Sequence, residues 1–327
     1  MLENGSPIVI ISHELPNDWI HILENHCTVF SGPPDATHLE SSLINLLPKA
    51  YGLLCLLTIP ITEQVLNLSP NLRVVSNMAA GVDNIDVKAC TLRGIPVGNT
   101  PGVLTESTAD LTMALLLTIA RKIPTASADA HEGRWKTWSP AGWLGIELHG
   151  KTLGIIGMGK IGQAVAKRAI GFGLNIVFSD PSPVNYPNAY QVSLEKLLMQ
   201  SDIISLHAPL TPDTRGIINR SAFLLMKPTA ILINAARGQL VDSDDLVEAL
   251  QGKIISAAAL DVTDPEPLPP THPLYQFENC LIVPHIGSAT QQARRKMAEL
   301  ACQNLLAGLR GERLIHCVNP EVYKQIM

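Results

Sequence analysis

The stretch from Thr152 to Asp180 constrains the fold of this chain more than any other part of its sequence. A short apolar run over 152–156 leads directly into a glycine turn, GMGKIG, at 157–162, and apolar residues then recur at helical spacing up to residue 170. A second apolar run over 174–179 ends at Asp180. Strand, glycine turn, helix, strand and acid follow one another in the order of a dinucleotide-binding βαβ unit.

Each part of this unit has a physical role. Gly157 permits the tight turn, Gly159 lets the backbone approach a pyrophosphate, and Gly162 lets the helix pack closely on the strand. The helix N-terminus offers free N–H groups and a positive dipole end to phosphates. Asp180 can accept hydrogen bonds from an adenosine ribose, or it can instead cap the turn at Pro181. A glycine turn alone is common, so the flanking strands and the acid carry the inference.

Composition bounds the class of protein. A chain of 327 residues, 46% of them hydrophobic, is long enough for two domains with sizeable cores. The net charge is −5 without a basic block, so we expect no nucleic-acid partner. The six cysteines are scattered without a CxxC pair, which favours reduced thiols in the cytoplasm and no metal site. The first residues do not resemble a signal peptide, and no apolar run is long enough to span a membrane.

The first hundred residues alternate between short apolar runs and mixed-polarity segments. Strands are predicted at 7–11, 28–30, 51–57, 72–77 and 95–97, with helices at 13–26, 61–68 and 87–93. This alternation predicts a compact parallel α/β unit, and the unit contains no phosphate fingerprint. A hinge-like linker, NTPG, follows at 99–102.

A long helix is predicted over 105–120, apolar on most of its surface and therefore buried on several sides. The segment 124–150 is less regular and carries Trp135, Trp138 and Trp143, which we expect to contact another protein. Beyond Asp180 the alternation resumes. Strands are predicted at 203–206, 230–234, 256–260 and 281–283, with helices at 193–200, 221–226, 243–250 (capped by Ser243) and 292–308.

Four residues that can do chemistry follow predicted strands: Arg237, Asp261, Glu266 and His285. In a doubly wound sheet, ligands bind beyond the carboxyl ends of the strands, so these side chains should face one site. Arg237 can hold a carboxylate and polarise a neighbouring carbonyl. His285 can give a proton to the carbonyl oxygen, and Glu266 can orient His285 and favour its charged form. Beside a nicotinamide this set indicates hydride transfer to a carbonyl, although each residue alone could be a surface ion pair, a loop charge or a strand cap.

At this point the chain resembles the D-isomer-specific 2-hydroxyacid dehydrogenase family from end to end. The matching motifs are GMGKIG at 157–162, NAARG at 234–238, LDVTDPEP at 260–267 and PHIGSAT at 284–290. The resemblance implies an α/β fold with two doubly wound parallel-sheet domains. A flavodoxin-like substrate domain, 1–102 and 288–327, would be split around a Rossmann nucleotide domain, 103–287. A homodimer is implied, formed through the long helix and the arm after it.

The resemblance makes Arg237, Glu266 and His285 the catalytic residues. With the glycine turn included, the residues expected to bind the cofactor are Thr108, Gly157, Gly159, Lys160, Ile161, Gly162, Asp180, His207, Ala208, Pro209, Thr214, Ala235, Ala236, Arg237, Asp261, His285 and Gly287. Those expected to bind the substrate are Leu56, Ala80, Gly81, Trp138, Arg237, His285 and Ser288, with Trp138 supplied by the partner's arm.

Within the family, the stretches 52–58, 100–111, 260–275 and 304–312 are most similar to glyoxylate/hydroxypyruvate reductases, which reduce small 2-oxo acids. Such reductases often prefer NADP and carry Arg or Lys after the second strand, whereas this chain has Asp180-Pro181. We therefore expect NAD to be preferred, with NADP possible. The alternatives are another dehydrogenase of the family, such as one like phosphoglycerate dehydrogenase, or a dinucleotide-sensing corepressor that binds without turnover.

Overall fold

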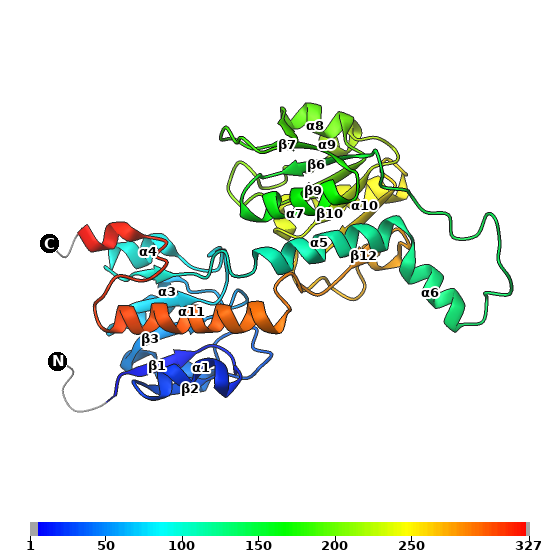
Figure 1. The fold of residues 1–327 in the computed structure, drawn as a ribbon. Coiled ribbons are helices and arrows are strands. Elements are labelled where there is room, and N and C mark those ends of the chain that lie inside the picture. The colour runs from blue at the N-terminus through cyan, green and yellow to red at the C-terminus, as the bar shows by residue number, and fades with distance from the viewer. Residues whose placement is uncertain (1–5, 325–327) are drawn as a thin grey trace. The chain divides into compact units, whose positions relative to one another are not determined.

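The computed structural model describes residues 6–324, which form two compact units. Of the described residues, the split unit combines 6–104 with 290–324, and the central unit is Thr105–Ala289 (Figure 1). The structure places the two boundaries after residues 104 and 289. The boundaries expected from the sequence, after residues 102 and 287, are each two residues earlier in the chain. That the split unit binds the substrate and the central unit the dinucleotide remains a prediction.

The split unit is built on a five-stranded parallel sheet in the order β2-β1-β3-β4-β5. Its strands are β1 (Ile8–Ile11), β2 (Thr28–Ser31), β3 (Ala50–Cys55), β4 (Val74–Asn77) and β5 (Val97–Gly98). Its helices are α1 (Asn17–Glu24), α2 (Ser41–Ile44), α3 (Glu63–Asn67), α4 (Val87–Leu92) and α11 (Gln291–Leu309), with short 3-10 turns at Leu47–Lys49 and Pro320–Lys324. The sequence alternation of the first hundred residues thus gives the expected parallel unit.

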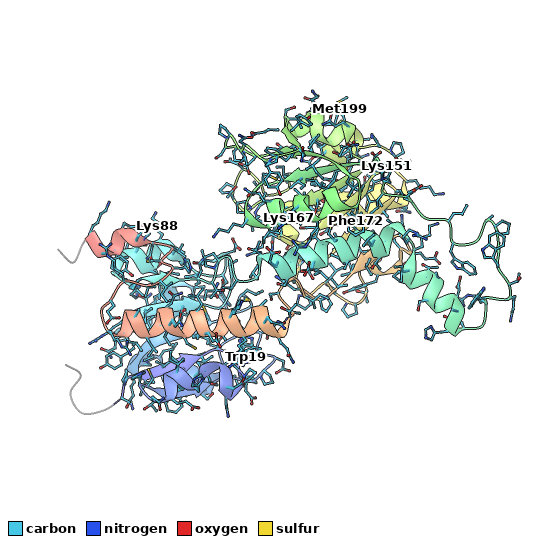
Figure 2. The ribbon with its side chains drawn as sticks, viewed as in Figure 1. Trp19, Lys88, Lys151, Lys167, Phe172 and Met199 are labelled. Carbon is cyan, nitrogen blue, oxygen red and sulfur yellow. The ribbon has the colours of Figure 1, made fainter. Side chains whose placement is uncertain are left out.

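Helix α11 brings the end of the chain back onto this sheet. Ala301 and Leu305 of α11 join Val9 and Val74 of the sheet in one apolar cluster, against which Trp19 of α1 also packs (Figure 2). The approach is close because Gly308 has no side chain: a Cβ there would lie 2.5 Å from the Val74 side chain. A second cluster covers the other face of the sheet.

The central unit has a seven-stranded parallel sheet in the order β12-β11-β10-β9-β6-β7-β8. Its strands are β6 (Thr152–Ile156), β7 (Asn175–Ser179), β8 (Ala189–Gln191), β9 (Ile203–Leu206), β10 (Ile231–Asn234), β11 (Ala257–Leu260) and β12 (Cys280–Ile282). Its helices are α5 (Thr105–Ala120), α6 (Ile123–His131), α7 (Lys160–Gly171), α8 (Leu194–Gln200), α9 (Arg220–Leu225) and α10 (Ser243–Gln251), with 3-10 turns at Gly238–Leu240 and Pro273–Gln276.

Helices cover both faces of this sheet. Ile155 and Ile203 point into a cluster with α5 and α7, while their neighbours Ile156 and Ile204 point into a cluster with α8 and α9. Alternate residues of a strand thus serve opposite cores, which is why these strands are apolar throughout their length. The predicted fold class, α/β with two parallel sheets, is confirmed.

Three local predictions were wrong. Residues 123–131 form helix α6, which has Pro124 in its first turn. The helix buries no side chain, so its sequence has no apolar stripe from which it could be predicted. The edge strand β8 was missed because it has only three residues. Helix α10 is capped by Asp242, whose Oδ1 accepts from Asp245 N at 3.0 Å, because the Ser243 hydroxyl instead donates to the carbonyl of Asp264.

Among the described residues, no helix is long and apolar enough to cross a bilayer, and no cluster of His, Cys, Asp or Glu side chains is suited to a metal ion. All six cysteines are free thiols. Burial raises the pKa of Cys55, Cys90, Cys280 and Cys302 to about 12, which keeps these thiols protonated near neutral pH.

Two glycines of α7 provide a matched test of how closely this helix approaches β6. A Cβ at Gly162 would lie 2.2 Å from the Gly157 carbonyl oxygen, whereas a Cβ at Gly171 meets nothing within 4 Å. We expect Gly162→Ala to lower the free energy of unfolding by about 1–3 kcal/mol. Gly171→Ala should be neutral or stabilising by up to about 1 kcal/mol. Urea unfolding of both variants measures this, and equal effects would contradict the close-packing role of Gly162.

Candidate active site

The predicted site residues of the central unit gather at one edge of its sheet. All of its paired strands are parallel, so their carboxyl ends meet at the same edge. The residues that follow these ends are Gly157 after β6, Asp180 after β7, His207 after β9, Ala235–Arg237 after β10, Asp261 after β11 and His285 after β12. The chain leaves β6 toward β7 on one side, and β9 lies on the other, so the strand order reverses beside the glycine turn.

The glycine turn has the geometry expected of a dinucleotide site. Gly157 has φ +93°, and a Cβ there would lie 2.6 Å from the backbone nitrogen of Ala208. Only glycine therefore fits between β6 and the end of β9. Gly159 is the residue before α7, and a Cβ there would point into open space. The turn thus leaves room for a phosphate group at the N-terminus of a twelve-residue helix.

Asp180 is fixed by two backbone groups. Its Oδ2 accepts from Met158 N in the glycine turn at 2.9 Å, and its Oδ1 accepts from Ser182 N at 2.9 Å. The sequence offered two alternatives, a carboxylate facing the nucleotide and a carboxylate capping the Pro181 turn. In the structure the carboxylate caps this turn through Oδ1 and holds the glycine turn through Oδ2, and its contact with the nucleotide remains a prediction.

The segment after β9 is held by its own side chains. Thr214 Oγ1 donates to the carbonyl of Pro209 at 2.6 Å, which fixes the loop that contains Ala208. His207 Nε2 pairs with Ser205 Oγ at 2.8 Å, while its Nδ1 is buried without a partner among the described residues. Burial lowers the pKa of His207 to about 4, so the imidazole is neutral near pH 7.

The turn that carries Arg237 depends on a residue that the sequence analysis did not single out. Asn234 ends β10 and is buried; its Nδ2 donates to the carbonyl of Arg237 at 2.8 Å, and its Oδ1 accepts from Ala236 N. Arg237 Nη1 donates to the carbonyl of Ala236 at 2.7 Å. The sequence contained one indication of this role: Asn234 is a polar residue at the end of an otherwise apolar strand.

His285 and Glu266 come from different loops and are in contact. Nδ1 of His285 lies 2.5 Å from Oε1 of Glu266, so the imidazole donates to the carboxylate. His285 has φ +51°, an uncommon conformation for a residue with a side chain, and its N–H donates to the carbonyls of Asp261 and Val283. Within residues 6–324, its other nitrogen, Nε2, has no hydrogen-bond partner.

Asp261 fixes the loop that follows β12. Its buried carboxylate accepts from Ile286 N at 2.6 Å and from Gly287 N at 2.9 Å. Burial raises the pKa of Asp261, although these two N–H donors and the nearby His285 act in the opposite direction. Thr108 Oγ1 of α5 donates to the carbonyl of Gly287 at 3.3 Å. The structure therefore brings together Thr108, Asp261 and Gly287, three of the residues expected to bind the cofactor.

The split unit holds the other predicted substrate residues. The carbonyl of Ala80 accepts from Asn99 Nδ2 at 2.7 Å, and the carbonyl of Gly81 accepts from Asn77 Nδ2 at 2.9 Å. The backbone N–H groups of Ala80, Gly81 and Val82 have no hydrogen-bond partner in the described part of the chain. Successive unpaired N–H groups after a strand form a site that suits an anion.

The remaining predictions concern exposed or loosely held residues. Trp138 is 81% exposed and Trp135 is 62% exposed, on the arm that follows α6. Trp143 is instead half-buried, and its Nε1 donates to Asp129 of α6 at 2.7 Å. Ser288 is half-buried in the loop after β12, with no side-chain hydrogen bond in the described structure.

The comparisons with known proteins agree with this geometry. Residues 113–287 match the family model described as D-isomer specific 2-hydroxyacid dehydrogenase, NAD binding domain. The chain belongs to the D-isomer-specific 2-hydroxyacid dehydrogenases. It is 43% identical to a glyoxylate reductase of Korarchaeum cryptofilum, over 97% of both chains. A solved structure of a Thermus thermophilus protein is 46% identical over 95% of this chain and 99% of that one, with a TM-score of 0.90.

A third relative is a solved NADPH-dependent glyoxylate/hydroxypyruvate reductase of Sinorhizobium meliloti in complex with NADP and malonate. It is 29% identical over 96% of this chain and 97% of its own, with a TM-score of 0.85. The predictions that this chain is an oxidoreductase of the D-2-hydroxyacid dehydrogenase family and that it uses a nicotinamide dinucleotide are therefore confirmed. The roles of individual site residues remain predictions.

The buried imidazole of this dehydrogenase should make its stability depend on pH. The pKa of His207 is about 4 in the folded chain, against an ordinary value of 6.5, so between these values the unfolded chain binds more protons. Its stabilising contribution is complete above pH 6.5 and falls by about 2 kcal/mol by pH 5. Urea midpoints at pH 8 and pH 5 should differ less in His207→Gln than in the wild type. His26→Gln, at an exposed position, should behave as the wild type; an unchanged pH response in His207→Gln would contradict the assignment.

Proposed function

We propose that this dehydrogenase reduces small 2-oxo acids, glyoxylate and hydroxypyruvate, to 2-hydroxy acids. The observation that carries the proposal is the 2.5 Å contact between His285 and Glu266 at the carboxyl edge of the sheet. This contact holds His285, the proposed proton donor, in one orientation, and His285 lies in the loop fixed by Asp261, Gly287 and Thr108. The names of the relatives from Korarchaeum and Sinorhizobium support this choice of substrates.

The dinucleotide would lie on the glycine turn and Asp180, and when bound it supplies hydride to the substrate carbon. His285 then serves as general acid: its unpaired Nε2 donates a proton to the carbonyl oxygen. Glu266 accepts from Nδ1, which leaves Nε2 to face the substrate and stabilises the positive charge of the imidazolium. Arg237, on a turn fixed by Asn234, holds the substrate carboxylate and polarises the adjacent carbonyl.

The unpaired N–H groups of Ala80, Gly81 and Val82 suit a carboxylate, which supports a substrate-binding role for this turn of the split unit. Leu56, half-buried at the end of β3, would contribute an apolar contact. This combination favours a substrate with one carboxylate and a short chain.

A homodimer through α5 and the arm completes the proposal. Apolar side chains of the arm are exposed, with Trp138 at 81% and Leu144 at 64%. The end of α5 and the arm also line a cavity of about 490 Å³ that includes Leu117, Ile146 and Phe172, the last shown at the end of α7 in Figure 2. A second copy of the chain would cover these surfaces and would place its Trp138 at the substrate.

Steady-state rates with a panel of 2-oxo acids and NADH test the proposed substrates. We expect higher kcat/KM for glyoxylate and hydroxypyruvate than for phenylpyruvate, because a small closed site excludes the larger side chain. Trp138→Ala should widen the range of substrates. A higher kcat/KM for phenylpyruvate would show the assignment to be wrong, and a wild-type protein that binds NADH but turns over none of these acids would be a binding protein instead.

The pH profile of Glu266→Gln tests how His285 is supported. Glutamine keeps the side-chain length but removes the negative charge that favours the imidazolium. Because reduction needs a proton on His285, the range of fast turnover should retreat toward lower pH. His285→Ala should instead lose about a hundredfold or more of turnover at every pH. A profile of Glu266→Gln that overlays the wild type would remove Glu266 from this role.

The Asp180 carboxylate favours NADH over NADPH. A 2′-phosphate beside it would bring two negative charges together, at a cost of about 1–4 kcal/mol, or roughly ten- to several-hundred-fold in affinity. No Arg or Lys occurs between Asp180 and Gln191 to offset this repulsion. We expect kcat/KM to favour NADH, Asp180→Asn to narrow the difference, and Asp180→Asn with Pro181→Arg to reverse it. Equal kcat/KM values for NADH and NADPH in the wild type would show that Asp180 does not select the cofactor. The expected preference differs from that of the Sinorhizobium reductase, which is NADPH-dependent.

A further inference from the structure

Two asparagines of the split unit form a hydrogen-bonded pair that the proposed reaction does not use directly. Asn77 ends β4 and is fully buried, and its Nδ2 donates to Asn84 Oδ1 at 2.9 Å. Asn84 is half-buried in the loop that follows β4. Buried amide groups are kept only where their hydrogen bonds are made, so the partners of this pair show what it holds.

The pair connects the loop after β3 with the turn after β4. Asn84 Nδ2 donates to the carbonyls of Leu56 at 3.1 Å and Ile59 at 2.9 Å. Asn77 Nδ2 also donates to the carbonyl of Gly81 at 2.9 Å, and its Oδ1 accepts from the thiol of Cys55. One amide pair therefore fixes both segments that are predicted to contact the substrate, Leu56 and Ala80–Gly81.

Peptide planarity transmits this constraint to the N–H groups. The carbonyl of one residue and the N–H of the next lie in one rigid plane and point in opposite directions. By holding the carbonyl of Gly81, Asn77 fixes the direction of the Val82 N–H. In the same way, Asn84 holds the carbonyl of Leu56 and fixes the N–H of Leu57. Neither of these N–H groups has a hydrogen-bond partner in the described part of the chain.

We propose that Asn77 and Asn84 are positioning residues for the substrate carboxylate: together they set the direction and spacing of the unpaired N–H groups on the two loops. The inference rests on the proposed reduction of 2-oxo acids. Since the pair touches neither the reacting carbonyl nor the dinucleotide site of the central unit, its loss should weaken substrate binding and leave cofactor binding unchanged.

Asn84→Asp tests this with almost no change in size. The carboxylate still accepts from Asn77 but cannot donate to the carbonyls of Leu56 and Ile59. We expect KM for glyoxylate to rise roughly tenfold or more, which corresponds to the loss of one or two hydrogen bonds, while KM for NADH stays within about twofold. Half-burial beside two carbonyl oxygens raises the pKa of the introduced acid. As the pH is lowered toward 5, a growing fraction is therefore protonated and donates again, so KM for glyoxylate should move back toward the wild-type value measured at the same pH.

The matched control is Asn71→Asp. Asn71 lies in the same unit and its Nδ2 also donates to a backbone carbonyl, that of Pro48 at 2.8 Å, but it is exposed and its side chain is hydrogen-bonded to neither loop. It should leave both KM values unchanged. If Asn84→Asp does not fold, Asn84→Ser, which has no charge and cannot span the two loops, is measured in its place.

The outcomes separate this inference from the function on which it rests. A wild-type protein without turnover of any 2-oxo acid refutes the proposed function. An active wild type whose Asn84 variant melts at a lower temperature but keeps its KM for glyoxylate overturns the inference, since the pair would then be structural only. Equal increases in KM for glyoxylate and NADH would overturn it as well.

Discussion

The close backbone contact between the glycine turn and the end of β9 is the constraint on which the central unit depends. Gly157 leaves no room for a side chain against Ala208, and Gly162 leaves none against the Gly157 carbonyl. These two contacts bring β6, α7 and β9 together at the point where the strand order reverses. The other strands extend the sheet from this point, and each of them except the edge strand β8 is followed by a predicted site residue at the same edge.

Distance along the chain matters little at such an edge. Thr108 and Gly287 are 179 residues apart and are hydrogen-bonded. Asp261 holds the same loop from another strand: its carboxylate accepts from Gly287 N, and its carbonyl accepts from His285 N. Parallel strands joined by covering helices produce this convergence without any local sequence signal, which explains how residues from six loops can lie at one edge of the sheet.

The fold and the position of the main site residues could be predicted because they follow from apolar runs and glycine positions that can be read directly from the sequence. The apolar runs of β6, β9 and β10 are buried on both faces, and the glycine turn needs glycine for steric reasons. Helix α6 could not be predicted, because it buries no side chain and so has no apolar stripe.

The roles of Asn77, Asn84 and Asn234 were missed for another reason. Each side-chain amide holds backbone carbonyls, and only the folded structure shows which carbonyls lie around it. Asp180 shows the same limit: the sequence suggested that its carboxylate caps the Pro181 turn, but not that its second oxygen also holds the backbone of the glycine turn.

The split unit has a consequence for synthesis of the chain on the ribosome. Its sheet strands lie within the first hundred residues, but the helix that covers one face, α11, begins only at Gln291. While residues 105–289 are being made, the apolar side chains of Val9, Ile11 and Val74 await their covering helix. Both core clusters of the central unit consist of its own residues, so its core is available before α11 is made. The nascent polypeptide thus exposes an apolar sheet face until α11 has been made, and this interval is when chaperones would be most useful to it.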